Sequence, residues 1–311
     1  MPLTPELREL AARVSNWGRW GADDQRGTLN LIDAAAVQRG AAAVRRGASF
    51  SLSIPMHADG PQTGRVLGRE NPKRTVTVAS FAFTGDPGDF QTSDDKIETG
   101  LQSATHWDAL AHAGYDDRLF NDTPASAITM EDGATRLGIE HFGPVVSRAI
   151  LCDIARLKGV EWFEEPYSIT GDDLDACISG AGLTVASGDI LLVRTGQMHW
   201  LREGERNRYA DISPGVGVES IEWLHDHDIA AIATDTHTFE PYPGTWVENP
   251  FLFPVHMIDL RDMGLPQGQQ WALDELAADC AADGVYECLL VATPLPIPGG
   301  LGGLVAPTAA K

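Results

Sequence analysis

The most informative part of the chain is residues 102–112, which read Gln102-Ser103-Ala104-Thr105-His106-Trp107-Asp108-Ala109-Leu110-Ala111-His112. Successive side chains of an extended strand alternate between its two faces, so Gln102, His106 and Asp108 would point the same way. In a helix, His106 and Asp108 would diverge by about 200°, because each residue turns by roughly 100°. The pattern therefore predicts a strand that leads into a turn.

The polar side chains of this segment favour a functional site. An imidazole nitrogen beside a carboxylate oxygen suits zinc, manganese or ferrous iron, and His112 could carry a proton. The alternative interpretation is a polar strand end whose histidines are merely hydrogen-bonded. A lone histidine would fit that alternative better than this dense group does.

Composition limits the partners that we expect. The chain has 311 residues, 43% of them hydrophobic, which is enough for a sizeable core in one large domain or two ordinary ones. Forty-four acidic against 23 basic side chains give a formal charge of −21, which repels phosphate backbones and anionic lipid surfaces. We therefore expect a small-molecule substrate, with no nucleic acid and no membrane as partner.

The cysteines and the N-terminal residues indicate a cytoplasmic protein. The four cysteines are scattered, form no C-x-x-C pair and resemble buried small hydrophobic residues. The first residues lack the pattern of a signal peptide, and no apolar run approaches 18 residues.

Two helices are predicted at the start of the chain. Thr4 followed by proline is typical of an N-cap and predicts a helix over about residues 5–15. A second helix is expected between its cap Asp33 and Gly47, where it stops. Residues 1–45 are therefore expected to form an N-terminal helical extension.

The next part of the chain is richer in strands. Residues 49–54 alternate strictly, as in a half-buried strand, and residues 74–83 continue in a β-rich manner. The glycine- and proline-rich stretch 57–72 between them is predicted to be a surface loop. A helix is expected near residues 129–137 and a buried strand over residues 147–153.

The second half of the chain alternates helix and strand. This alternation predicts α/β architecture with a substantial sheet, and we expect residues 46–311 to form one structural unit. The predicted helices cover residues 170–179, 218–227 and 273–282, and the predicted strands cover residues 190–193, 229–233 and 285–292.

Several common catalytic and cofactor motifs are missing. No helix follows the glycines of residues 299–303, and Gly215-Val216-Gly217 lacks a third glycine, so no nucleotide cofactor is expected. No G-x-S-x-G elbow and no H-E-x-x-H helix occurs either. The sequence therefore does not favour a serine hydrolase or a thermolysin-like metalloprotease.

The segment from Thr105 to His112 resembles the H-x-G-T-H-x-D-x-x-x-H signature of the metal-dependent cyclase family, which includes bacterial kynurenine formamidase and isatin hydrolase. Three further segments of the resemblance follow in the right order. They are Ala233-Thr234-Asp235-Thr236, Pro254-Val255-His256, and Leu289 to Gly300 with its Pro294-Leu295-Pro296 ending.

The resemblance covers about residues 45–305 and implies a fold. That fold is a compact, cyclase-like (swivelling β/β/α) domain, in which a closed, barrel-like mixed β-sheet is flanked by helices. The resemblance also implies a homodimer or homotetramer.

The resemblance further implies roles for four residues. His106 and Asp108 match metal ligands for zinc or manganese, and His112 matches the histidine that transfers a proton. His256 matches a later histidine of the family, and we take it as a second candidate catalytic residue.

Two positions depart from the family pattern. Gln102 stands where the family has its first histidine, and the later glutamate falls on Gln269. The carbonyl oxygen of an amide is a weak metal ligand. The sequence thus leaves two possibilities open, one divalent ion (Mn or Zn) held by His106, Asp108 and Gln102, or a site without metal.

Three functions are consistent with these residues. The leading hypothesis is metal-dependent hydrolysis of an amide, formamide, lactam or lactone bond in a small, ring-containing substrate, with His112 moving the proton. The alternative is a metal-free cyclase or dehydratase that uses His112, Asp108 and His256 for acid–base chemistry. The third hypothesis is a non-catalytic binder of small molecules.

The candidate substrate contacts are aromatic or polar side chains near the motif or in later loops. His237 follows a predicted strand, at a place where pocket residues of α/β sheets are common. Trp20 lies in a glycine-flanked loop that either closes the edge of the core or lines a pocket. The main candidates are Trp107, Tyr115, Phe120, His237, Gln269 and Trp20, and Trp200, Phe239 and Trp246 are further aromatic candidates.

Overall fold

A mixed sheet forms the centre of the protein in the computed structural model, which describes residues 3–244 and 253–311. The sheet is parallel from β7 to β12 and antiparallel toward both ends. In spatial order its strands are β1 (Ser49–Ser51), β15 (Thr308–Ala310), β13 (Glu287–Val291), β7 (Val146–Asp153), β9 (Ile190–Arg194), β11 (Ala231–Thr234), β12 (Gln267–Gln269), β4 (His106–Asp108) and β14 (Gly302–Leu304).

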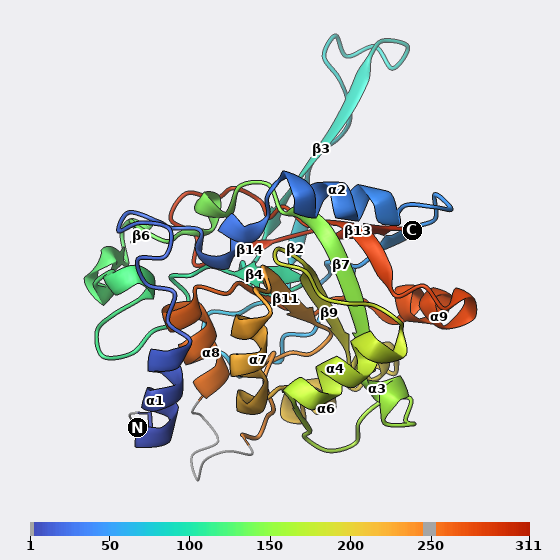
Figure 1. Ribbon diagram of the computed structural model, residues 1–311. Helices are drawn as coiled ribbons and strands as arrows, with labels where there is room; N and C mark the ends of the chain where they lie inside the picture. Colours follow the sequence, from blue (N-terminus) through green and yellow to red (C-terminus); the bar gives the residue numbers. More distant parts are fainter. Residues whose placement is uncertain (1–2, 245–252) are drawn as a thin grey trace.

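The sheet curls into a half-barrel with helices packed around it (Figure 1). Within the described part of the chain its end strands β1 and β14 are not hydrogen-bonded to each other, so the barrel stays open. The predicted α/β domain with a barrel-like mixed sheet and flanking helices is confirmed, but the sheet is a half-barrel and not the closed barrel that the resemblance implied.

The central strands are buried on both faces, as is typical of parallel strands. Ala149 and Leu151 of β7 belong to one hydrophobic cluster, whereas Ile150 and Cys152 belong to the cluster on the other face. The first cluster receives side chains of α9 (Asp274–Asp283), and the second receives those of α1 (Pro5–Arg13), α4 (Gly171–Gly180) and α7 (Ile221–Asp226).

Helix α2 (Ala34–Ala43) lies against β7 and β13. It approaches closely because Gly40 has no side chain, since a Cβ atom there would lie 2.7 Å from the backbone carbon of Ser147. The two N-terminal helices are thus packed onto the sheet domain.

Several helix ends follow the sequence signals, although α2 ends at Ala43 and not at Gly47. The side chains of Thr4 and Asp33 accept hydrogen bonds at the starts of α1 and α2, and Thr170 and Asp173 form a capping box at the start of α4. Helix α9 ends at Gly284, whose left-handed φ of 75° suits glycine.

The helix predicted near residues 129–137 is wrong. This segment forms a small hairpin from β5 (Ile128–Thr129) and β6 (Gly133–Ala134). Gly133 has a φ of +70°, and a Cβ atom there would lie 2.4 Å from the carbonyl oxygen of Gly299. The tight contact with this distant loop favours the hairpin over a helix.

The remaining elements are short, apart from a hairpin of β2 (Lys73–Ala82) and β3 (Gln91–Glu98) that extends away from the body (Figure 1). Residues 57–72 form a loop, as predicted. None of the helices in the described ranges is long and apolar enough to span a membrane. The other named elements are α3 (Ile154–Leu157), α5 (Met198–Arg202), α6 (Arg206–Asp211), α8 (Pro254–Ile258), β8 (Ser168–Ile169) and β10 (Gly215–Val216).

Candidate active site

Strand β4 positions His106 and Asp108 on one face of the sheet, as the alternation predicts. Both side chains are fully buried. Trp107 points to the opposite face, where its indole N–H donates to the Ala292 carbonyl at 2.8 Å and its ring meets Trp271 at 4.8 Å between centroids. Because Trp107 is fully buried in the core, we no longer expect it to contact a substrate.

The neighbouring strand β12 makes room for this arrangement. Gly268 pairs with Trp107, and a Cβ atom at Gly268 would lie 2.7 Å from the Trp271 indole nitrogen and 2.9 Å from the Trp107 ring. Gln269 pairs with His106, so its side chain lies on the same face as His106 and Asp108.

His106 Nε2 and Asp108 Oδ1 lie 3.5 Å apart, and neither atom has a hydrogen-bond partner. His106 Nδ1 lies 2.7 Å from the Ala104 carbonyl oxygen. Only a protonated Nδ1 can donate to that oxygen, so the neutral ring presents a lone pair at Nε2. With the ring in this neutral form, two acceptor atoms face each other without a hydrogen between them.

His112 lies at the edge of this pair. Its backbone N–H donates to the Ala109 carbonyl at 2.8 Å, which forms the predicted turn after the strand. Its Nε2 lies 3.7 Å from Asp108 Oδ1, and 22% of its side chain is exposed. His112 is thus close to the pair and accessible from outside it.

A chain of hydrogen bonds leads from Asp108 to a buried glutamate. Gln269 Nε2 donates to Asp108 Oδ2 at 2.7 Å and lies 3.1 Å from His256 Nε2. On the far side of the ring, His256 Nδ1 lies 2.6 Å from Glu240 Oε1. These contacts fit a neutral His256 that donates from Nδ1 to Glu240 and accepts from Gln269 at Nε2.

Glu240 was not predicted from the sequence. Its carboxylate also accepts the backbone N–H groups of Val255 at 3.1 Å and His256 at 2.9 Å, at the start of α8. The one available signal was its place shortly after β11, where α/β sheets commonly carry pocket residues. In the sequence, a position shortly after this strand indicates only His237 as a pocket residue.

Gln102 reaches the same face of the sheet. Gly302 of β14 pairs with Asp108, and a Cβ atom at Gly302 would lie 2.6 Å from Gln102 Nε2. The Gln102 amide therefore fills the space above Gly302, beside Asp108. Gln102 thus lies on the face that carries His106 and Asp108, and its predicted role as a third metal ligand stays a prediction.

His237 is a buried histidine with an unsatisfied nitrogen. It is 8% exposed, its Nδ1 has no hydrogen-bond partner, and its ring packs edge-on against Tyr209 at 5.9 Å. Burial lowers the pKa of His237 to about 3, with Arg69 and His106 adding to the effect. His237 is therefore neutral near the site, and its predicted substrate contact stays a prediction.

Burial and charge also set the protonation of the central residues. Burial lowers the pKa of His112 to about 4, although the Asp108 carboxylate opposes this shift. Burial alone would raise the pKa of Asp108, but His112, His106 and His256 outweigh it and hold that pKa below its usual range. At neutral pH the site thus combines an ionised carboxylate with an imidazole that can accept a proton.

The other predicted aromatic contacts are engaged elsewhere. The Tyr115 hydroxyl donates to Asp262 at 2.7 Å, and Phe120 is fully buried against Gly264. The Arg19 guanidinium lies over the Trp20 ring. Of the further candidates, Trp200 and Phe239 are buried, and Trp246 lies outside the described residues.

The donor atoms suit one divalent ion better than two. Nitrogen and oxygen ligands at about 2.0–2.1 Å in a tetrahedral shell lie roughly 3.3 Å apart, close to the 3.5 Å between His106 Nε2 and Asp108 Oδ1. Among the described residues, no three His, Cys, Asp or Glu side chains form a complete metal-binding group. His106 and Asp108 would therefore be the two strong ligands, and an amide or a water molecule would complete the coordination shell of the ion.

Comparisons with known proteins identify the family of the chain. The family model described as "Putative cyclase" matches residues 50–241. A crystal structure of a novel cyclase has 36% sequence identity and a TM-score of 0.87, over 96% of this chain and 99% of that chain. The chain belongs to the cyclase family.

Isatin hydrolases share the fold at lower identity. Isatin hydrolase A from Ralstonia solanacearum has 21% identity and a TM-score of 0.63, over 89% of this chain and 95% of that chain. An isatin hydrolase bound to the product analogue thioisatinate has 17% identity and a TM-score of 0.61, over 89% and 98%. No curated protein matches the chain in sequence.

Proposed function

We propose that the protein is a metal-dependent hydrolase that opens an amide, formamide, lactam or lactone bond of a small, ring-containing molecule. The observation that carries the proposal is the unpartnered pair of His106 Nε2 and Asp108 Oδ1, buried and 3.5 Å apart. Two buried acceptors without a shared hydrogen are costly unless a cation satisfies both.

His106 and Asp108 would hold the ion, and the Gln102 amide lies on the same face to assist. A bound divalent ion polarises the substrate carbonyl and lowers the pKa of water toward ~7. The contact of His106 Nδ1 with the Ala104 carbonyl fixes the ring, so that its Nε2 would be free to bind the ion.

His112 is the proton carrier in this proposal. It is neutral, partly exposed and 3.7 Å from Asp108, so it can take a proton from the attacking water. It then delivers the proton to the leaving nitrogen or oxygen as the bond opens. Asp108 holds the imidazolium that forms in between through its charge.

The ring-containing substrate class is supported by two observations. Phe253 is half-buried and lies edge-on to the His256 ring at 5.6 Å, so one partly accessible aromatic ring borders the site. Among the proteins with the same fold, one isatin hydrolase was solved with the ring-derived product analogue thioisatinate.

A panel of isatins, formanilides and lactones tests this function. We expect wild-type protein with added Mn²⁺ or Zn²⁺ to hydrolyse at least one class. His112→Ala should lower kcat by roughly 10²–10⁴-fold, whereas His225→Ala, which changes a histidine on α7 that contacts Asp226, should leave kcat unchanged. Equal turnover by His112→Ala and wild type would contradict the assigned role.

A metal-free acid–base enzyme is the second candidate function. It is favoured by the continuous hydrogen-bonded chain from Asp108 through Gln269 and His256 to Glu240, which needs no ion. In that case His112, Asp108 and His256 would perform cyclase or dehydratase chemistry. Activity that survives complete chelation would select this candidate over the hydrolase.

A further inference from the structure

His237 is a buried histidine that the proposed mechanism does not use. It is 8% exposed, and its Nδ1 atom has no hydrogen-bond partner among the described residues. The Gln270 backbone N–H donates to the Thr236 carbonyl at 3.0 Å, and the Gln270 side-chain amide donates to the Gln102 carbonyl at 3.2 Å. His237 therefore borders the segment that leads into β4, and a ligand bound there could supply the missing partner.

The loop of residues 57–72 brings an arginine to the same segment. The Gln62 side-chain amide donates to the Ser103 carbonyl at 3.1 Å. Near the end of the loop, the Arg69 Cα atom would lie 3.8 Å from a Cβ atom added at Gly100. The loop is thus fastened against the segment before β4, with Arg69 at the contact.

The Arg69 guanidinium has no anionic partner in the described part of the chain. Arg69 is half-buried, and no described residue gives its side chain a carboxylate or a hydrogen bond, whereas Arg65 of the same loop is paired with Asp211. Burial is the main cause of the low pKa values of His237 and His112, and the positive charge of Arg69 adds to both. Arg69 is therefore near enough to both rings to act on them electrostatically.

The carboxylates of the site do not neutralise Arg69. Asp108 and Glu240 are both held by hydrogen bonds from other groups. Glu70, the next residue in the chain, is exposed, and within the described ranges none of these three carboxylates forms an ion pair with Arg69. The site therefore keeps one cationic side chain for an external anion.

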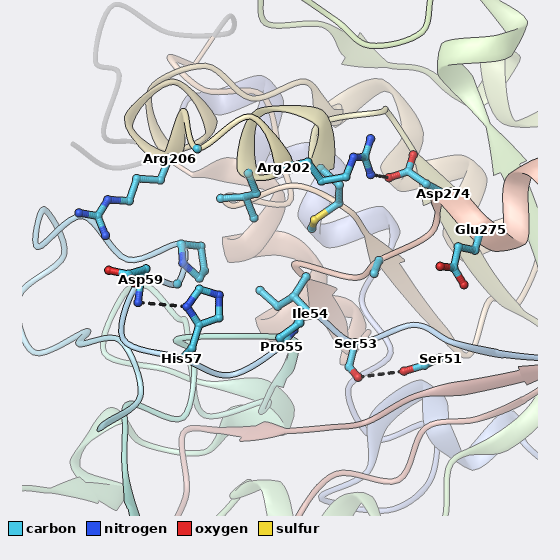
Figure 2. A pocket seen from close by; sticks show the side chains of 16 residues that line it. Ser51, Ser53, Ile54, Pro55, His57, Asp59, Arg202, Arg206, Asp274 and Glu275 are labelled. Carbon is cyan, nitrogen blue, oxygen red and sulfur yellow. Dashed lines mark hydrogen bonds and ion pairs between the residues drawn. The ribbon is translucent and has the colours of Figure 1, made fainter. Parts of the chain in front are cut away.

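A second arginine without an ion pair among the described residues provides a contrast. It lines a cavity of about 660 Å³ beside α5 and the start of α9 (Figure 2), which contains none of the candidate catalytic or metal-binding residues. Two guanidinium groups and three carboxylates line this cavity, those of Arg202, Arg206, Asp59, Asp274 and Glu275. An anion would meet a net negative charge there, so the surroundings of Arg69 suit it better.

We propose that Arg69 and His237 form an anion-binding subsite next to the proposed metal site, and that the substrate carries a carboxylate that binds there. The planar guanidinium matches the two oxygens of a carboxylate, and the neutral His237 ring can donate one N–H to them. One positive charge suits a singly charged carboxylate better than a doubly charged phosphate. The inference rests on the proposed function, because it makes the hydrolysed molecule an acidic one.

Benzoate binding by chelator-treated protein tests the subsite without a metal ion and without turnover. In isothermal titration calorimetry, wild type should bind benzoate on the order of tenfold more tightly than benzamide, its neutral counterpart. Arg69→Met removes the charge but keeps an apolar side chain, and it should abolish this preference. Arg69→Lys keeps the charge and should retain part of the preference.

Two further variants locate the bound carboxylate. His237→Phe keeps an aromatic ring without its nitrogens and should weaken benzoate binding on the order of fivefold. Arg206→Met is the matched control in the cavity of Figure 2 and should leave benzoate binding unchanged. Equal affinity of wild type for benzoate and benzamide, or benzoate binding that depends on Arg206 and not on Arg69, would overturn the proposal.

Hydrolysis assays separate the failure of this inference from the failure of the proposed function. Formanilides with a carboxylate on the ring should have a lower KM than formanilide itself, and Arg69→Met should raise KM for the carboxylates alone. If no substrate of the panel is hydrolysed while benzoate still binds through Arg69, the hydrolase proposal fails and the subsite stands. If formanilides are hydrolysed irrespective of charge and benzoate binds no better than benzamide, the hydrolase stands and the subsite is wrong.

Discussion

The side-chain amide of Gln269 can donate both of its hydrogens within the site, one to Asp108 and one to His256. A carboxylate at this position would instead place a third acceptor between two others, which is unfavourable unless a proton or a cation intervenes. The amide therefore stabilises this part of the site without an ion, which is compatible with the single ion proposed between His106 and Asp108.

Replacing Gln269 by glutamate tests this interpretation. In chelator-treated protein, Gln269→Glu should lower the free energy of unfolding by about 1–3 kcal/mol, because buried acceptors lose their donor. Urea titration measures the change, and the exposed Gln38→Glu serves as the control. Equal stability of Gln269→Glu and wild type would show that the amide is not needed as a donor.

Glu240 is expected to act by positioning His256. Glu240→Gln replaces an acceptor of one ring N–H and two backbone N–H groups with an amide that cannot accept them all. We expect kcat to fall roughly 10–100-fold, as for other residues that orient a site histidine, with KM little changed. Steady-state kinetics measure kcat and KM separately, with the exposed Glu9→Gln variant as the control. An unchanged kcat in Glu240→Gln would refute the positioning role of Glu240.

The residues of the site differ in how far the sequence predicts them. His106, Asp108 and His112 lie within seven positions, so strand alternation and one turn are enough to bring them together. Glu240 and His256 meet although they are 16 positions apart, and Gln269 reaches Asp108 through the pairing of strands 161 positions apart. Such contacts depend on the tertiary fold, which local patterns do not contain.

At the scale of single elements, capping residues and glycines predict helix ends correctly where no distant part of the chain intervenes. The Thr170 and Asp173 capping box starts α4, and the left-handed Gly284 ends α9, as predicted. Near Gly133 the local signal fails, because this glycine takes a left-handed φ of +70° and packs closely against the carbonyl of the distant Gly299. Tertiary contact there overrides helix propensity.

The capping box of α4 provides a stability test. Thr170→Ala removes the acceptor for the Asp173 backbone N–H, and we expect the free energy of unfolding to fall by about 1 kcal/mol. Ser179→Ala, near the other end of the same helix, should change it by no more than about 0.5 kcal/mol. Equal effects in urea denaturation would mean that the cap contributes nothing specific.

At the scale of the whole molecule, the sheet assembles the site from distant parts of the chain. Strand β4 lies between β12 and β14, which come from the last fifth of the sequence, and α8 and the segment after β11 add His256 and Glu240. The alternation of helices and strands predicts the α/β class, but not this order of strands. The order is what places every candidate catalytic group on one side of the sheet.

The most direct test of the central claim is the metal content of protein purified without a metal-affinity tag, together with its hydrolytic activity before and after chelation. We expect about one manganese or zinc ion per chain in wild type, and almost none in Asp108→Asn. Activity should disappear on chelation and return when the ion is restored. A metal-free protein that hydrolyses its substrate equally well after chelation would contradict the account.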